Sequence, residues 1–319
     1  MLELARNSKW PLREILIGAL LACAPLMAGQ MAVPGSVNYV EGQVTLNGSA
    51  LTSGAIGSAQ VEAGRVLETG LGKAEVLLTP GVFFRLGDNS ALRMVSPGLS
   101  NTQVELLRGQ GMLEVAELFK DNHLTVLDHG ASTLIDKRGL YAFNADNPKV
   151  SVFDGEASVS AQDRQIKLKK GKETSLVGTL HAQGFDRDHQ DELYSWSRLR
   201  SEYEAQAGAQ YAQTVVVNGG PWWGAGWYWD PWWSSYAFVP GDGILYSPFG
   251  WGFYSPFAVY PGIGFVYGRG FVGRGFVHGR PPVAAFRGGQ APAARSSFGG
   301  GFHGGGTGAG GFHGGGGRR

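Results

Sequence analysis

Cysteine is almost absent from this chain, and acidic residues stop well before its end. The one cysteine, Cys23, lies inside an apolar run near the N-terminus. If that run is removed, nothing remains to form a disulfide, a thiol nucleophile or a thiolate metal site. No aspartate or glutamate follows Asp242, although the whole chain has a formal net charge of only +1. The end of the chain is therefore a separate cationic segment. Its arginines are Arg269, Arg274, Arg280, Arg287, Arg295, Arg318 and Arg319.

The sequence also lacks the patterns that usually mark an enzyme. It shows no carboxylate pair in a rigid setting, no histidine spaced with serine or cysteine, no zinc-type spacing and no phosphate-binding loop. Asp154 and Glu156 flank a glycine and are explained as exposed hairpin residues. We therefore predict a non-enzymatic protein without cofactor or catalytic residues. An exported enzyme that acts on polysaccharide is the alternative.

The N-terminus has the order of a secretory signal peptide. Basic residues precede an apolar run over residues 15–27, and small residues follow at Ala28 and Gly29. The run contains Pro25 and is shorter than the ~20 residues that span a bilayer. We expect a signal peptide over residues 1–28, export to the periplasm or cell surface, and no transmembrane span in the mature chain.

Lipidation is the alternative at this end of the chain. The stretch Leu20-Leu21-Ala22-Cys23 resembles the lipobox of bacterial lipoproteins, in which the cysteine carries lipid and becomes the first mature residue. Leu21 is atypical for its position in that motif. Under the simpler interpretation, Cys23 is only an apolar residue of the signal peptide.

The middle of the chain is a series of short alternating runs separated by turn residues. Val40 to Leu46 alternates and ends at Asn47-Gly48, a dipeptide that favours hairpin turns. Within Val82 to Leu86, alternation places Arg85 on the face opposite its apolar neighbours. No stretch here has a long helical period, so residues 37–180 are predicted to form one all-β domain of many short strands.

Several glycine-punctuated motifs follow one another in this domain. They are Val40-Glu41-Gly42-Gln43-Val44, Thr69-Gly70, Ala74-Glu75-Val76-Leu77-Leu78 with Pro80-Gly81, Val104-Glu105-Leu106 before Gly109, Gly139-Leu140-Tyr141-Ala142-Phe143, Val150-Ser151-Val152-Phe153-Asp154-Gly155-Glu156-Ala157-Ser158-Val159, and Leu168-Lys169-Lys170-Gly171-Lys172-Glu173. Their order resembles a FecR-like periplasmic domain over roughly residues 37–180.

The resemblance implies an elongated, solenoid-like β fold that binds protein partners or ligands outside the cytoplasm; a sandwich-like sheet is the alternative. It implies no catalytic residue. Complete FecR regulators also carry a cytoplasmic anti-sigma segment and a transmembrane helix, and this sequence shows neither. We therefore do not carry sigma-factor signalling over, although a periplasmic component of a signal-transduction system remains an alternative function.

A short amphipathic helix is predicted over residues 186–207. Its expected apolar face consists of Leu193, Trp196, Leu199 or Arg200, and Tyr203. Asp188 is its predicted N-cap. We expect this helix to dock on the β domain or on a second copy of it. A metal site is the alternative interpretation of Asp186, Asp188, His189 and Asp191.

Segment 215–261 is rich in tryptophan, tyrosine and proline. Clustered tryptophans suit contact with a glycan, a protein or a membrane interface. The candidate contact residues are Trp222, Trp223, Trp227, Trp229, Trp232 and Trp233. The alternative is that these rings fold back onto the β domain or form a poorly ordered adhesive linker.

Segment 262–319 is predicted to be a disordered Gly/Phe/Arg-rich tail. Its positive charge suits an anionic surface such as lipopolysaccharide or phospholipid, and export argues against a specific nucleic-acid partner. His303 and His313 alone are weak evidence for a metal site. Together these features predict an exported cell-envelope protein that binds or scaffolds a protein or glycan.

Overall fold

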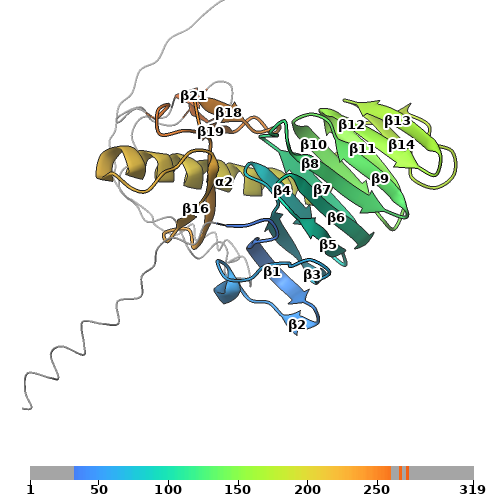
Figure 1. Cartoon of the computed structure of the whole chain (residues 1–319), viewed down its shortest axis with the longest axis horizontal. Helices are drawn as coiled ribbons and strands as arrows, with labels where there is room; N and C mark the ends of the chain where they lie inside the picture. The colour runs from blue at the N-terminus through green and yellow to red at the C-terminus, as the bar shows by residue number, and fades with distance from the viewer. Residues whose placement is uncertain (1–31, 260–265, 268–270, 273–319) are drawn as a thin grey trace, which may run out of the picture. The chain divides into compact units, whose positions relative to one another are not determined.

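The computed structural model describes residues 32–259, 266–267 and 271–272. The predicted signal peptide 1–28, with Cys23, lies outside the described residues. So does nearly all of the predicted tail 262–319, including its arginines, His303 and His313. Within the described part the protein is mostly β, with a large mixed sheet and one long helix (Figure 1).

The strands of the large sheet are short and follow one another closely along the chain, as the turn spacing predicts. They are β1 (Val37–Leu46), β2 (Ser49–Ala50), β3 (Val66–Leu77), β4 (Val82–Leu86), β5 (Ala91–Pro97), β6 (Asn101–Arg108), β7 (Gln110–Val115), β8 (His123–Asp128), β9 (Ala131–Ile135), β10 (Gly139–Asn144), β11 (Lys149–Asp154), β12 (Glu156–Ala161), β13 (Arg164–Lys169), β14 (Lys172–Ser175) and β15 (Gln183–Gly184).

The remaining elements of the described part are one short 3-10 helix, one long α-helix and three strand pairs. They are η1 (Ser53–Ala55), α2 (Glu192–Asn218), β16 (Gly226–Asp230) with β17 (Ser235–Val239), β18 (Ile244–Tyr246) with β19 (Gly252–Tyr254), and β20 (Val266–Tyr267) with β21 (Phe271–Val272). Of these helices only α2 is longer than one turn, and none in the described part is long and apolar enough to cross a membrane.

The sheet order is β13, β12, β9, β8, β6, β5, β3, β4, β7, β10, β11, β14, β15, with β1 and β2 attached at β3. Neighbours pair antiparallel except β6 and β8, which run parallel. The first part of β3 pairs with β5 and its last part pairs with β4. This strand therefore belongs to both halves of the sheet.

Glycines allow the bend at which β1 and β3 cross from one half to the other. Gly42 has a φ of +66°, and the register between β1 and β3 shifts between Gly42 and Val44. A Cβ on Gly72 would lie 2.3 Å from the carbonyl oxygen of Glu41. No other residue type fits so close an approach, which is the usual reason for glycine at a bulge.

One apolar core lies between the two halves of the sheet. Alternation directs Val82, Phe84 and Leu86 of β4 into this core, as predicted, while Arg85 faces the other way. The rings of Phe84 and Phe143 stack there with centroids 6.4 Å apart. Strand β1 and every strand from β3 to β13 contribute to the same cluster.

The opposite face of β3, β4 and β7 is also covered. Helix α2 and the two hairpins β16–β17 and β18–β19 pack on it, and a second apolar cluster forms around Phe83, Trp227 and Phe238. Phe83 and Phe84 are both fully buried, although they point to opposite sides of one strand. The expected docking of the helix on the β domain is thus confirmed.

The helix differs from its prediction in position and length. Residues 186–207 were expected, but α2 starts at Glu192 and ends at Asn218. Its N-cap is Asp191, whose side chain accepts a hydrogen bond from the Tyr194 amide at 2.7 Å, whereas Asp188 belongs to a preceding turn closed by Asp186. The helix continues because residues 205–212 include strong helix formers, and it stops at Gly219 in the left-handed conformation.

At the one position of the predicted face where the sequence leaves a choice, Arg200 is buried and Leu199 is exposed. The buried side combines leucine, small residues and charged residues, namely Leu193, Ser197, Arg200, Ser201, Glu204, Ala205, Ala207, Gly208, Ala209 and Ala212. A Cβ on Gly208 would lie 2.4 Å from the Phe238 carbonyl oxygen, so glycine lets the helix approach β17 closely. A hydrophobicity pattern cannot detect a face of this kind.

Candidate functional site

Three charged side chains lie side by side on the outer face of the sheet. Glu75 of β3 stands opposite Arg85 of β4, and the Arg85 Nε donates to Glu75 Oε2 at 2.7 Å. The Arg85 Nη1 donates to Glu114 Oε2 of β7 at 2.6 Å. All three residues are fully buried, because α2 covers this part of the sheet.

The helix adds a second arginine and a third carboxyl group. Arg200 Nη2 donates to Glu75 Oε1 at 2.8 Å and to Glu204 Oε1 at 2.5 Å. Asn38 of β1 donates to the same two carboxyl groups, at 3.2 Å and 3.0 Å. We call Glu75, Arg85, Glu114, Arg200 and Glu204 the ionic cluster.

The ionic cluster contains three acidic and two basic side chains, so one carboxyl group has no matching cation. Burial alone would raise the pKa of Glu75, but the guanidinium groups of Arg200 and Arg85 hold it at about 2. Burial and the neighbouring Glu75 carboxylate raise the pKa of Glu204 well above its usual range. Among the carboxyl groups of the cluster, Glu204 is therefore the one whose neutral form the surroundings favour.

Two hydroxyl groups extend the ionic cluster to the hairpin β18–β19. Ser201 of α2 donates to Glu114 Oε1 at 2.7 Å, and Ser247, next to β18, donates to the same oxygen at 2.5 Å. On the other side, the Tyr236 amide of β17 donates to Asn38 Oδ1 at 2.7 Å. The cluster thus attaches the helix and both aromatic hairpins to the sheet.

The aromatic hairpins are ordered by contacts with the sheet and with each other. Trp227 packs edge to face on Phe83, with ring centroids 4.9 Å apart, and Phe253 stacks on the same ring at 5.9 Å. Phe238 contacts both Trp227 and Phe253. Segment 222–259 therefore forms a second layer on the β domain, as in the alternative in which the rings fold back.

The six candidate tryptophans do not share one environment. Trp227 is buried, with 3% of its surface exposed, and three others, Trp222, Trp229 and Trp233, are half-buried. Trp233 donates its indole N–H to Gln210 of α2 at 3.1 Å. Only Trp223 and Trp232 are largely exposed, at 73% and 61%. The structure thus separates the set into anchoring rings and exposed rings.

Other exposed apolar residues lie near Trp223 in the chain or contact its neighbour Trp222. The Trp222 ring contacts Phe257 edge to face at 5.1 Å, and Phe257 is 68% exposed. Val217 at the end of α2 is exposed as well. The Trp223 amide donates to the Tyr228 hydroxyl at 3.0 Å, which fixes its backbone.

The acidic side chains before α2 accept hydrogen bonds from nearby backbone amides. Asp186 accepts the amide of Asp188, and Asp191 caps the helix. Asp186, His189 and Asp191 also line one cavity of about 600 Å³. Among the residues that the structure describes, no group of three or more histidine, cysteine or acidic side chains is arranged to hold a metal ion.

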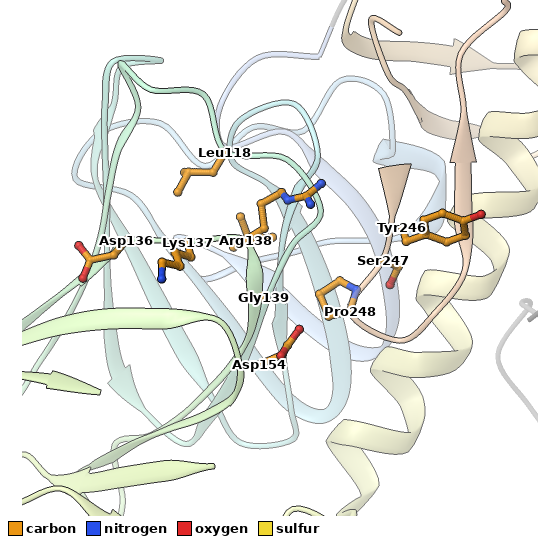
Figure 2. Close-up of a pocket in the computed structure, with 10 residues that line it drawn as sticks. Leu118, Asp136, Lys137, Arg138, Gly139, Asp154, Tyr246, Ser247 and Pro248 are labelled. Atoms are coloured by element: carbon orange, nitrogen blue, oxygen red, sulfur yellow. The ribbon is translucent and has the colours of Figure 1, made fainter. Parts of the chain in front are cut away.

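A cavity of about 590 Å³ opens where the hairpin β18–β19 meets the ends of β7, β10 and β11 (Figure 2). One wall is formed by Tyr246, Ser247 and Pro248. The sheet side is lined by Val115, Leu118, Asp136, Lys137, Arg138, Gly139 and Asp154. Sequence patterns did not single out this set, because its two walls are about ninety or more residues apart in the chain.

Glu117 is another residue that the sequence patterns did not indicate. Its Oε2 atom is buried and has no hydrogen-bond partner among the described residues. Burial raises the pKa of Glu117 to about 7, although the charge of Arg138 acts against this. A Cβ on Gly81 would lie 2.8 Å from the Glu117 Cβ and 3.0 Å from Phe238, which places Glu117 between the sheet and β17.

Comparisons with known proteins give only a distant structural likeness. No model of a known protein family matches the chain, and no curated protein sequence does. Two crystal structures of a candidate anti-sigma factor from Parabacteroides distasonis, at 2.50 Å and 1.65 Å resolution, each align with a TM-score of 0.36 and with 16% and 15% sequence identity. Each alignment covers 42% of this chain and 64% of the solved chain, so this protein spans less than two thirds of their length.

Proposed function

We propose that this protein is a non-enzymatic, exported cell-envelope module that binds or scaffolds a protein or glycan through the exposed rings of its second layer. The observation that carries the proposal is the exposure of Trp223, just before β16, and Trp232, in the turn between β16 and β17, on a hairpin that is itself packed on the sheet. Large exposed aromatic side chains held on a rigid frame are typical of contact surfaces.

The order of the second layer supports a preformed surface. Trp227 of β16 and Phe253 of β19 anchor the two hairpins on Phe83. The hydroxyl of Ser247 also anchors the hairpin β18–β19 on the ionic cluster. A surface that is already ordered loses less conformational entropy on binding than a flexible tail. The rings of Trp223 and Trp232 can therefore contribute more of their buried area to affinity.

Export rests on the N-terminal sequence. The basic residues, the apolar run over residues 15–27 and the small residues at Ala28 and Gly29 form the signal-peptide order. The FecR-like order of motifs agrees with a binding role outside the cytoplasm. The cationic residues after Asp242 add attraction to an anionic envelope surface.

The test measures cosedimentation of the full chain with an isolated envelope fraction and, separately, with insoluble cell-wall glycan. We expect Trp223→Ala combined with Trp232→Ala to reduce the bound fraction at least about tenfold, as for aromatic hot spots. Leu99→Ala is the matched control, because Leu99 is an exposed apolar residue of the β domain. Unchanged binding by the double variant, or recovery of the native protein from the cytoplasm, would overturn the proposal.

A further inference from the structure

Among the charged residues that line the cavity between the sheet and the hairpin β18–β19, Arg138 differs because it has no ion-pair partner in the described part of the chain. Lys137 pairs with Glu156 at 3.1 Å, Asp154 pairs with Lys170 at 2.7 Å, and the Asp136 carboxylate accepts from Ser158. Arg138 makes no ion pair with any described residue, and its one hydrogen bond, to the Ala116 carbonyl, is long at 3.5 Å. Most of its N–H donors are therefore available to a ligand.

The cavity is built on fixed elements. Ser247 of its outer wall donates to Glu114 in the buried ionic cluster, and the Phe249 amide donates back to the Ser247 hydroxyl at 3.0 Å. On the sheet side, Gly139 allows β10 to approach β11 closely, since a Cβ there would lie 2.1 Å from the Asp154 carbonyl oxygen. The two walls are thus held in place before any ligand arrives.

The charged and aromatic residues of the lining favour some classes of ligand over others. An exposed arginine with unused donors suits a planar carboxylate, which it can bind through two parallel hydrogen bonds. Asp136 and Asp154 make the cavity unfavourable for a dianion such as phosphate, because like charges repel. Tyr246 is the one aromatic residue of the lining, and Figure 2 shows its ring directed away from Arg138, so a sugar stacked on that ring would not face the arginine.

The remaining lining suits a peptide. Val115, Leu118 and Pro248 supply apolar surface, and Asp154 lies near Gly139, across from Pro248 (Figure 2). A volume of about 590 Å³ is within the usual range of small-ligand sites. We propose that this cavity binds a short acidic peptide segment whose carboxylate pairs with Arg138. This is a second binding site, separate from the exposed tryptophans.

The test uses two probes that differ in one group. Binding of N-acetyl-Ala-Glu-amide and N-acetyl-Ala-Gln-amide to the full chain is followed by NMR titration. We expect the glutamate probe to bind about tenfold more tightly than the glutamine probe, the effect of one charge-assisted hydrogen-bonded pair. The preference should fall as salt concentration rises, since Arg138 is exposed.

Arg138→Ala should remove the preference for the glutamate probe, and Arg138→Lys should retain part of it. Arg164→Ala is the matched control, because Arg164 is an exposed arginine on β13 outside the cavity. Unchanged NMR spectra away from the site will establish that each variant is folded.

The proposal is overturned if both probes bind equally, if Arg138→Ala keeps the preference, or if an N-acetylglucosamine disaccharide or inorganic phosphate binds there more tightly. The Trp223→Ala and Trp232→Ala variants should leave this binding unchanged, so the two proposals can fail separately.

Discussion

The two faces of strand β4 bury side chains of opposite character. Val82, Phe84 and Leu86 face the core between the halves of the sheet, which consists of aliphatic and aromatic residues. On the other face, Arg85 lies in a charged layer beneath α2, and Phe83 lies in the aromatic cluster. The same strand therefore takes part in a purely apolar core and in an interface that combines charged and aromatic residues.

The apolar core and the ionic cluster on the two faces of β4 have different roles: the first stabilises the fold, and the second determines which arrangement of elements is formed. Apolar burial stabilises in proportion to area and tolerates many arrangements. A buried ion pair contributes little net stability because both charges lose hydration, yet it is costly to leave one partner alone. We therefore interpret the ionic cluster as the feature that fixes where α2 and the hairpins sit, while the inner core keeps the sheet folded.

The largest expected effect comes from Phe84→Ala. Loss of this fully buried ring should lower the free energy of unfolding of the sheet by about 4 kcal/mol. Phe83→Ala is the matched change on the opposite face and should loosen the second layer first. Urea unfolding can be followed by far-UV circular dichroism for the sheet and by tryptophan fluorescence for the second layer, because residues 37–180 contain no tryptophan.

The comparison fails if the two alanine variants behave alike. Coincident loss of both signals in Phe83→Ala, at the same urea concentration as in Phe84→Ala, would show that the two layers unfold as one unit. A fluorescence change that precedes the circular dichroism change only in Phe83→Ala is the expected result.

A smaller effect distinguishes two carboxyl groups of the ionic cluster. Glu75→Gln should destabilise the protein at neutral pH by about 2 to 3 kcal/mol, because both arginines lose an ionised partner. Glu204→Gln should cost less than about 1 kcal/mol, since the glutamine replaces a carboxyl group whose neutral form the surroundings already favour. Equal costs in urea unfolding would contradict this difference between the two carboxyl groups.

A still smaller effect concerns Glu117 and pH. Its pKa is raised in the folded state, so the folded protein holds the proton more tightly than the unfolded chain and loses stability as pH rises from 4.5 to about 7. After allowance for partial exposure, we expect the free energy of unfolding of the unchanged protein to fall by about 1 kcal/mol over this pH window because of Glu117. The Glu117→Gln variant should not show this decrease. Thermal unfolding of both proteins at several pH values measures the difference; parallel pH profiles would exclude it.

Alternation along the strands was sufficient to predict the inner core. It placed Val82, Phe84 and Leu86 on one face and Arg85 on the other, and the turn dipeptides marked where strands end. These features are local, because a strand of period two needs only its own sequence to define its faces. The predominantly β fold followed from the same pattern.

The second layer was not predictable in the same way. An outward-facing Arg85 is expected in solvent unless a partner far along the chain covers it, and its cover comes from Arg200 to Glu204 on the helix. The helix face is made of small and charged residues, so it gives almost no periodic apolar signal. The cavity at Arg138 depends on the same long-range contact, since Ser247 brings its second wall into place.

The central claim is that the tryptophan-bearing hairpins form an ordered layer on the sheet, and hydrogen exchange of the full chain tests it most directly. The amides of Tyr228 in β16 and Ala237 in β17, which form a hydrogen-bonded pair of the hairpin, should exchange slowly, with protection close to that of Phe84 in β4. Exchange of β16 and β17 at the rate of an unstructured peptide, while β4 stays protected, would contradict the account.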